Sequence, residues 1–115
     1  MHVETDDNGL VPSALQEAIK TVRAAGRKIK FLYTIPNYQN PSGVLLPASR
    51  RTEILNICRE AGIFVVEDNP YGLLGFDEPS PNAMRAEDSE NVIYLGSFSK
   101  TIAPGLRVGW ALLPP

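Results

Sequence analysis

The chain has 115 residues, with 11 basic and 13 acidic side chains and a formal net charge of −2. Hydrophobic residues make up 43% and charged residues 21%, a composition typical of a globular domain and not of a disordered or fibrous chain. The nearly balanced charge gives no electrostatic ground for nucleic-acid binding through this segment. No apolar run approaches the roughly 20 residues of a membrane span, so no membrane partner is expected. The single cysteine, Cys58, excludes an internal disulfide and fits a reducing, cytoplasmic setting.

The first half of the chain predicts one helix and one strand. A helix is expected over 12–26, because apolar residues recur there at helical spacing, with Pro12 suited to the first turn and Gly26 to the C-terminal cap. The short apolar and aromatic run 29–34 predicts a buried strand. Turn-forming residues fill 36–43, PNYQNPSG, which is therefore expected to be a loop.

The second half predicts a helix and three strands. A helix is expected over 47–61, with Gly62 closing it. The continuous β-branched and aromatic run 63–67, IFVVE, is typical of a strand buried on both faces. Two further apolar runs, 92–95 and 107–113, predict a third and a fourth strand.

The order of these elements predicts an α/β fold. Strands that alternate with helices form a mostly parallel sheet with flanking helices and right-handed crossovers. The last link, from Leu95 to Arg107, has little room for a helical crossover, which favours a fourth strand antiparallel to the third. In such sheets, ligands bind beyond the carboxyl ends of the strands.

Polar side chains follow each of the first three predicted strands at this edge of the sheet. The first strand is followed by an amide, the second by a carboxylate and a phenol, and the third by two hydroxyls and an amine. A guanidinium returns to the same edge at the start of the fourth strand. We call this set the seven rim residues: Asn40, Asp68, Tyr71, Ser97, Ser99, Lys100 and Arg107.

These groups together match the chemistry of one small molecule. A neutral lysine amine forms a Schiff base with a carbonyl. Hydroxyls and a guanidinium suit a phosphate dianion. A carboxylate at the end of a strand can hold a protonated ring nitrogen, and an amide with a phenol can bind a phenolate oxygen. An aldehyde, a phosphate, a pyridinium nitrogen and a phenolate on one molecule describe pyridoxal 5′-phosphate.

Each rim residue also has an ordinary structural explanation. A lysine after a strand is usually just solvated, Asp68 alone would be a turn cap before Pro70, and Asn40 before Pro41 is a common turn residue. The functional interpretation rests on their convergence at the ends of successive strands.

Two other motifs are tested and fail. Residues 97–100 match the S-x-x-K pattern of serine acyltransferases, but the S-D-N and K-T-G motifs that should accompany it are missing from the sequence. A phosphate-binding P-loop would need glycines where Tyr94 and Ser99 stand.

Three blocks of the sequence resemble a known family. YTIPNYQNPSG (33–43), VVEDNPYG (65–72) and GSFSKTIAPGLRVGW (96–110) are similar to the central blocks of fold-type I pyridoxal-phosphate-dependent aminotransferases of class I/II. Within that class, the blocks resemble 2-aminoadipate and kynurenine aminotransferases and the aminotransferase-like domains of MocR transcription regulators. The resemblance runs through nearly the whole chain.

The resemblance implies a role for each rim residue. Lys100 would form the Schiff base with the cofactor and move a proton between the amino acid and the cofactor. Asp68 would pair with the pyridine nitrogen, and Asn40 and Tyr71 would bond the 3′ oxygen. The catalytic residues would therefore be Lys100, Asp68 and Tyr71.

The remaining rim residues, Ser97, Ser99 and Arg107, would bind the cofactor phosphate. Because family members are several times longer, residues 1–115 are expected to be a partial large domain without its N-terminal part and the C-terminal small domain. The resemblance implies a homodimeric parent protein that exchanges an amino group between an amino acid and a 2-oxo acid, with glutamate and 2-oxoglutarate as a family-level expectation. The alternatives are the effector domain of a MocR-type regulator and an inactive fragment.

The sequence also predicts three structural features. Cys58 should be a core residue, and Trp110 should pack the fourth strand against a helix. A sheet taken from a larger one would leave an edge and an apolar face open, which predicts self-association of the isolated chain.

Overall fold

The computed structural model describes residues 1–75 and 79–115. Its elements, in chain order, are β1 (Thr5–Asp6), β2 (Gly9–Leu10), α1 (Pro12–Ala24), β3 (Phe31–Thr34), α2 (Ala48–Glu60), β4 (Phe64–Asp68), α3 (Met84–Glu87), β5 (Val92–Ser97), the 3-10 helix η1 (Pro104–Leu106) and β6 (Gly109–Leu112).

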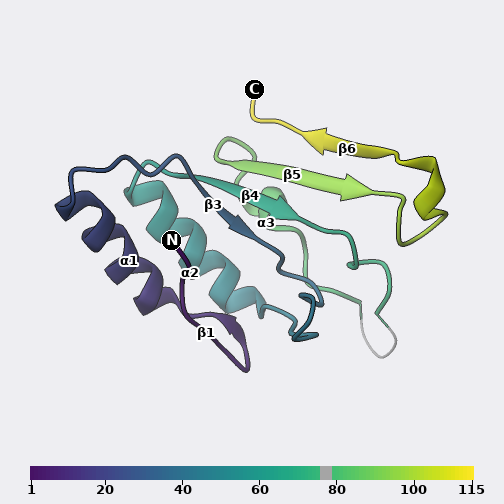
Figure 1. Ribbon diagram of the computed structural model, residues 1–115, viewed down its shortest axis with the longest axis horizontal. Coiled ribbons are helices and arrows are strands. Elements are labelled where there is room, and N and C mark those ends of the chain that lie inside the picture. The colour runs from purple at the N-terminus through teal and green to yellow at the C-terminus, as the bar shows by residue number, and fades with distance from the viewer. Residues whose placement is uncertain (76–78) are drawn as a thin grey trace.

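The main sheet contains four strands in the order β3-β4-β5-β6 (Figure 1). The first three are parallel, and β6 runs antiparallel to β5. Only η1 lies in the link between β5 and β6, so the chain turns back on itself instead of crossing over the sheet. The predicted α/β class and the antiparallel fourth strand are confirmed.

Both predicted helices form within two residues of their expected ends. Pro12 occupies the first turn of α1, and Gly26 and Gly62 follow α1 and α2 with φ angles of 71° and 62°, as expected of C-terminal caps. Three short elements were not predicted: the β1–β2 hairpin, α3 and η1. They are too short to carry a periodic pattern of apolar residues.

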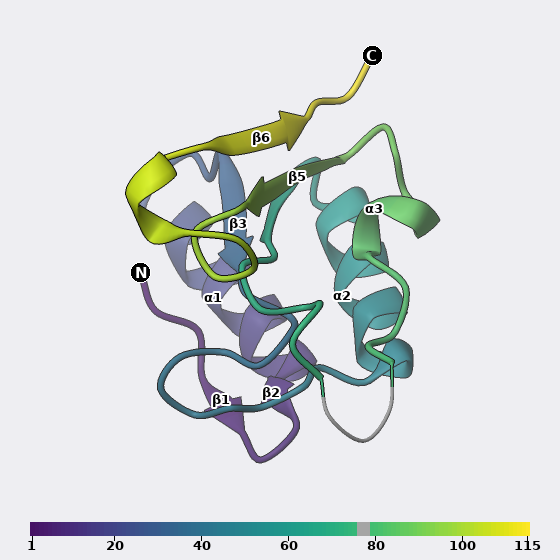
Figure 2. The same cartoon turned by 90° about the vertical axis from the view of Figure 1, so that its right-hand side faces the viewer.

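Helices cover one face of the sheet. Figure 2 shows α2 and α3 on the same side of the strands, and α1 packs against α2. The side chains that share this core include Leu15, Ile19, Ile54, Leu55, Cys58, Val65, Met84 and Val92. Burial raises the pKa of the Cys58 thiol to about 12, and its 1% exposure confirms Cys58 as a core residue and not a reactive thiol.

The opposite face of the sheet is open within the described residues, which corrects two predictions. The run 63–67 is not buried on both faces, because Val65 and Glu67 are fully buried while Phe64 is 46% exposed. The first strand is likewise only half covered, with Phe31 54% exposed. Both corrections have one cause: the described helices supply apolar side chains to one face only. This open apolar face supports the predicted self-association, which stays a prediction.

Two further predictions about the fourth strand are wrong. Arg107 does not open the strand, which begins at Gly109; it follows η1 in the left-handed region with φ 54° and ψ 35°. Trp110 does not pack against a helix. Its ring stacks on Tyr94 of the neighbouring strand at a centroid distance of 5.3 Å, and it lies where a side chain at position 96 would stand. Cross-strand pairing therefore replaces the expected helix contact. None of the helices in the described ranges has the length and apolar character needed to cross a bilayer.

Candidate active site

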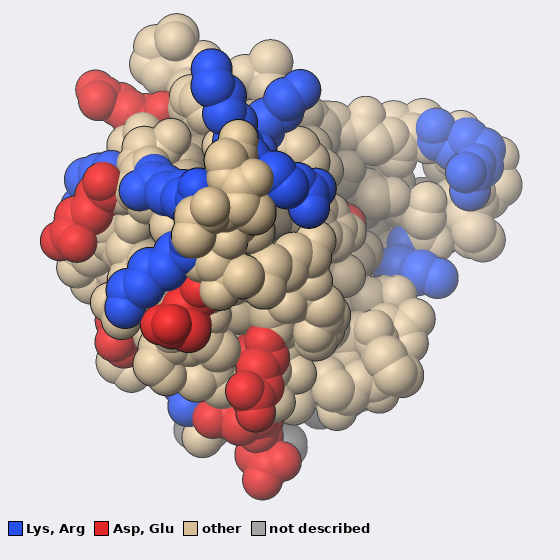
Figure 3. All heavy atoms as spheres, turned by 60° about the vertical axis from the view of Figure 1, so that its left-hand side comes forward, with Lys and Arg blue, Asp and Glu red and all other residues tan. Residues whose placement is uncertain are grey.

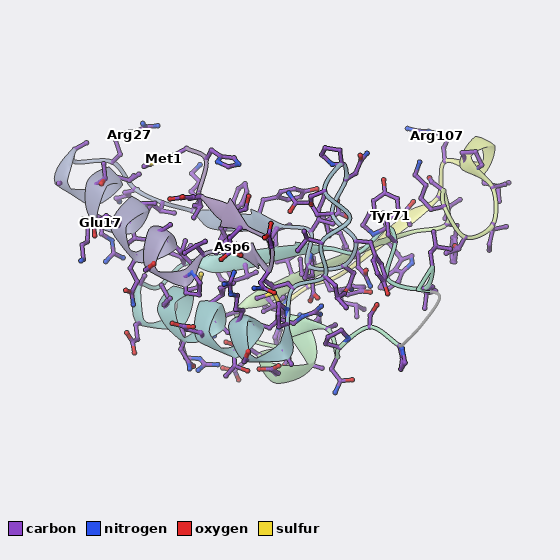
Figure 4. The ribbon with its side chains drawn as sticks, turned by 90° about the horizontal axis from the view of Figure 1, so that it is seen from below. Met1, Asp6, Glu17, Arg27, Tyr71 and Arg107 are labelled. Atoms are coloured by element: carbon purple, nitrogen blue, oxygen red, sulfur yellow. The ribbon has the colours of Figure 1, made fainter. Side chains whose placement is uncertain are left out.

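The carboxyl ends of β3, β4 and β5 meet at one edge of the sheet, which we call the rim. Their arrows point the same way in Figure 1, because the pairing is parallel and in register, with Thr34 opposite Glu67 and Asp68 opposite Leu95. Asp68 is the last residue of β4 and Ser97 the last of β5, so both strands run further than predicted. Figure 4 shows Tyr71 and Arg107 at this end of the molecule.

The loop after β5 carries Lys100 toward the turn after β4. The Nζ atom of Lys100 lies 6.0 Å from the centroid of the Tyr71 ring. The loop is held by its own backbone, since the amides of Ile102 and Ala103 both donate to the Phe98 carbonyl. Lys100 itself is exposed. The structure thus brings the predicted catalytic amine beside the predicted phenol.

The same loop is tied to the segment that contains Arg107. The Phe98 amide donates to the Val108 carbonyl at 3.1 Å, and the Ser99 amide donates to the Ser97 Oγ at 3.0 Å. Arg107 adopts a left-handed conformation that is rare for residues other than glycine, asparagine and aspartate. Strain of this kind, about 1–3 kcal/mol, is found mostly at functional sites. These contacts tie the end of β5, which carries Ser97, to the loop segments that carry Ser99 and Arg107.

The carboxylate of Asp68 has a partner that sequence reasoning missed. The Tyr33 hydroxyl donates to Asp68 Oδ2 at 2.6 Å. Tyr33 pairs with Val66, two residues before Asp68, so the two side chains are diagonal neighbours on the open face of the sheet. Burial and the Asp68 carboxylate together raise the pKa of Tyr33 to about 12. The signal that locates Tyr33 is the strand register, which the sequence does not contain.

Asn40 lies in a tight turn after β3. The Gln39 amide donates to the Val44 carbonyl, and the Ser42 hydroxyl donates back to the Gln39 carbonyl. The Asn40 side chain is exposed and makes no hydrogen bond to any described residue.

A second set of polar side chains lies close to the same strand ends but on the helix-covered face. It comprises Asn37, Asn69 and Tyr94, joined by side-chain hydrogen bonds. Sequence reasoning passed over them because single asparagines near prolines are ordinary turn residues.

The rim residues keep their binding capacity for a ligand. Within residues 1–75 and 79–115, no side chain of the seven bonds the side chain of another, and neither Lys100 nor Arg107 forms an ion pair. An amine, a carboxylate, a phenol, an amide, two hydroxyls and a guanidinium are thus available. This donor set fits pyridoxal 5′-phosphate, which needs an amine for its aldehyde, an acceptor for its ring nitrogen and cationic or hydroxyl donors for its phosphate.

The Tyr33–Asp68 hydrogen bond can be tested by titration. We expect one tyrosine to ionise near pH 12 instead of near pH 10, and Tyr33→Phe to remove that step from an ultraviolet titration. Because the pKa is raised in the folded state, the stabilising contribution of this phenol is complete below its ordinary pKa of 10.0 and is lost as the pH rises toward 12. All tyrosines ionising together near pH 10 in the folded protein would contradict the hydrogen bond.

Exposed cations are numerous at the other end of the molecule and provide controls. Figure 3 shows Lys and Arg gathered at the end that carries the amino ends of the strands. Arg27, Lys28 and Lys30 are exposed there. Figure 4 labels Arg27 at the end opposite Arg107. Exposure alone therefore does not single out Lys100; its position at the rim does.

Comparison with known proteins identifies the family. The family model for aminotransferase class I and II matches residues 1–115. Aromatic-amino-acid aminotransferase 1 of Thermococcus litoralis is 40% identical over 116 residues, which cover 100% of this chain and 28% of that protein. An uncharacterized HTH-type transcriptional regulator of Bacillus subtilis is 44% identical over 86 residues, covering 74% of this chain and 18% of the regulator.

A solved structure agrees with these matches. The alpha-aminoadipate aminotransferase of Thermus thermophilus, complexed with N-(5'-phosphopyridoxyl)-L-leucine, superposes with a TM-score of 0.88 at 39% identity, over 100% of this chain and 29% of that chain. The chain therefore spans less than a third of the length of the relatives it matches. With a family match along its full length and a fold that agrees, the chain belongs to the aminotransferase class I and II family.

Proposed function

We propose that the protein that carries this chain is a pyridoxal-phosphate-dependent aminotransferase, which moves an amino group between an α-amino acid and a 2-oxo acid. The observation that carries the proposal is the rim: successive parallel strands end in a carboxylate, a phenol, two hydroxyls and an amine that do not bond one another. Family membership supports the cofactor, as does the phosphopyridoxyl ligand in the Thermus structure.

When bound, pyridoxal 5′-phosphate supplies an electron sink that draws charge away from the Cα atom of an amino acid. Lys100 would hold the cofactor covalently through Nζ and, once released, would accept and return the proton at Cα. Its exposed position beside the Tyr71 ring lets the amine reach a ligand at the rim. Asp68 would hold a proton on the ring nitrogen with the carboxylate oxygen that Tyr33 leaves unused.

The other rim residues would orient the cofactor. Tyr71 and Asn40 would donate hydrogen bonds to the 3′ oxygen. Ser97, Ser99 and Arg107 would bind the phosphate from the loop that joins β5 to β6, where Arg107 offers paired donors to two phosphate oxygens.

Substrate, assembly and location belong to the same proposal. We expect an amino acid and a 2-oxo acid as substrates, with glutamate and 2-oxoglutarate as one pair. A homodimer in the cytoplasm is proposed for the full-length protein. The buried free thiol of Cys58 supports a reducing compartment. The open apolar face of the sheet supports packing against the rest of the full-length protein or against a second copy.

A regulatory role is the second candidate. It is favoured by the match to the HTH-type regulator, which covers 74% of this chain. Such a protein would bind the cofactor at the same rim and would carry a DNA-binding domain outside these residues. An amino-group transfer assay on the full-length protein separates the two roles.

The cofactor assignment is tested by adding pyridoxal 5′-phosphate, scanning the absorbance, reducing with borohydride and mapping the labelled peptide. The experiment is run on this chain and on the full-length protein. We expect the label on Lys100 alone, with the exposed Lys28 and Lys30 as internal controls for non-specific reaction. Label on the full-length protein only would mean that residues outside 1–115 complete the pocket. Label on several lysines, or on none in either protein, would overturn the assignment.

A further inference from the structure

A buried guanidinium anchors polar side chains behind the rim. Arg51 of α2 is fully buried, although no carboxylate among the described residues lies within ion-pair distance of it. It donates instead to the Leu46 carbonyl at 2.9 Å, the Asn82 carbonyl at 3.1 Å and Asn37 Oδ1 at 2.6 Å. These acceptors are held firmly, because a buried guanidinium donor without an acceptor would destabilise the fold.

From Arg51 a chain of side-chain hydrogen bonds crosses the strand ends. Asn37 Nδ2 donates to Asn69 Oδ1 at 2.9 Å, and Asn69 Nδ2 donates to the Tyr94 hydroxyl oxygen at 2.6 Å. The Tyr94 ring in turn stacks on Trp110 of β6. We call Arg51, Asn37, Asn69 and Tyr94 the Asn69 network. It links α2 to the segments that follow β3 and β4 and to the middle of β5.

The direction of every bond in the Asn69 network is set at Arg51. A guanidinium donates only, so Asn37 must present its oxygen to Arg51 and its nitrogen to Asn69. Asn69 must then present its oxygen to Asn37 and its nitrogen to Tyr94. The amide of Asn69 therefore has a single orientation that satisfies both neighbours, and reversing it would set two donors against each other.

The turn that carries two rim residues is wrapped around this amide. Asn69 lies between Asp68 and Tyr71, and its backbone amide donates to the Leu95 carbonyl at 2.9 Å. A Cβ atom at Gly72 would come within 2.3–2.7 Å of the Asn69 side chain, so only glycine lets the turn close on the amide. The chain from 68 to 72 is thus packed onto a side chain of fixed orientation.

We propose that Asn69 is a positioning residue for the cofactor site: held by the Asn69 network, it fixes the turn that presents Asp68 and Tyr71 at the rim. Tyr33 holds Asp68 from the open face of the sheet, and Asn69 holds the same turn from the helix-covered face. This inference rests on the proposed function, since it concerns the placing of cofactor-binding groups.

The surroundings of Asn69 make it possible to distinguish an effect on the turn from an effect on global stability. Asn69 and Tyr94 border a hollow of about 580 Å³, so water can reach the groups that a substitution leaves unpaired. Replacing either residue should therefore change global stability little. The turn, however, would lose the contact that selects its conformation.

The test compares Asn69→Ala and Tyr94→Phe with wild type in the full-length protein. Tyr94→Phe removes only the acceptor of the Asn69 bond and keeps the ring that stacks on Trp110. Asn56→Ala is the matched control, because Asn56 is an exposed α2 residue whose side-chain oxygen accepts a hydrogen bond from Arg59 and, within the described ranges, contacts no rim residue by hydrogen bond. Three quantities are measured: amide hydrogen exchange over 69–72 without cofactor, the Kd for pyridoxal 5′-phosphate, and the pH midpoint of the bound-cofactor absorbance.

Both variants should exchange the 69–72 amides at least about fivefold faster than wild type and bind the cofactor roughly five- to tenfold more weakly, the effect of losing one well-placed hydrogen bond. The pH midpoint should rise by about half a unit, because a looser Tyr71 stabilises the anionic 3′ oxygen less. Asn56→Ala should match wild type in all three.

Two results would overturn the inference. The first is wild-type exchange, affinity and midpoint in both variants. The second is a general loss of stability with unchanged affinity and midpoint, which would make the network structural only. A wild-type protein that takes no label on Lys100 would instead overturn the proposed function.

Discussion

Replacing Lys100 with alanine in the full-length protein is expected to lower the rate of amino-group transfer by a factor of at least about 10³ and to abolish borohydride-stable attachment of the cofactor. The size of the effect follows from the two duties assigned to one amine, covalent attachment and proton transfer at Cα. The group beside the Lys100 Nζ atom is the Tyr71 ring, at 6.0 Å, and a phenol cannot form a Schiff base in its place. The loss is measured as kcat in a coupled assay and as label in the mapped peptide.

Lys100→Arg and Lys30→Ala sharpen this result. Arginine keeps the positive charge at the rim but cannot become a neutral nucleophile, so it should fail as alanine does. Lys30 is exposed just before β3, at the opposite end of the strands, and its removal should leave both label and rate unchanged. Activity within tenfold of wild type in Lys100→Ala would show that the reacting amine lies elsewhere.

Replacing Glu67 with alanine is expected to lower the free energy of unfolding by about 2–4 kcal/mol. Glu67 is fully buried in β4, and its two carboxylate oxygens accept the backbone amides of Met84 and Arg85, each at 3.0 Å. Alanine would leave both donors without their partner and would remove a carboxylate whose charge acts on the buried Arg51. Urea denaturation followed by circular dichroism measures the loss.

Glu67→Gln and Glu53→Ala are the comparison variants for this prediction. Glutamine keeps one acceptor oxygen for the first turn of α3. The free energy of unfolding of Glu67→Gln should therefore lie between those of wild type and Glu67→Ala. Burial raises the pKa of Glu67. The amide nitrogen of glutamine would, however, face one of the two backbone donors, so this variant should still be less stable than wild type. Glu53 is exposed on α2, and its removal should change stability by less than about 0.5 kcal/mol. Equal stability of Glu67→Ala and wild type would mean that α3 is held by other contacts.

Glu67 also explains why α3 escaped prediction. The segment 84–87 has only four helical residues and no capping side chain of its own. Its first two amides are satisfied by the Glu67 carboxylate, 17 and 18 residues earlier in the chain, near the end of β4. Local sequence signals concern neighbours within a few residues, so a helix capped from a distant strand leaves no local trace.

The sequence by itself determined the two long helices, the four strands and their order along the chain. It did so because the spacing of apolar residues and the caps at Pro12, Gly26 and Gly62 are local properties. It also located the rim, because the ends of parallel strands must meet at one edge of the sheet. The short link after Leu95 left the fourth strand no route but an antiparallel return.

Only the tertiary structure decided which side chains meet. The Tyr33–Asp68 bond depends on the diagonal register of β3 and β4, and the Asn69 network joins residues that are 14, 32 and 25 positions apart. Which face of each strand is covered, and that Trp110 meets Tyr94 instead of a helix, also follow from packing. Such contacts depend on three-dimensional register and on the polarity of donors and acceptors, and a linear pattern of residue types specifies neither.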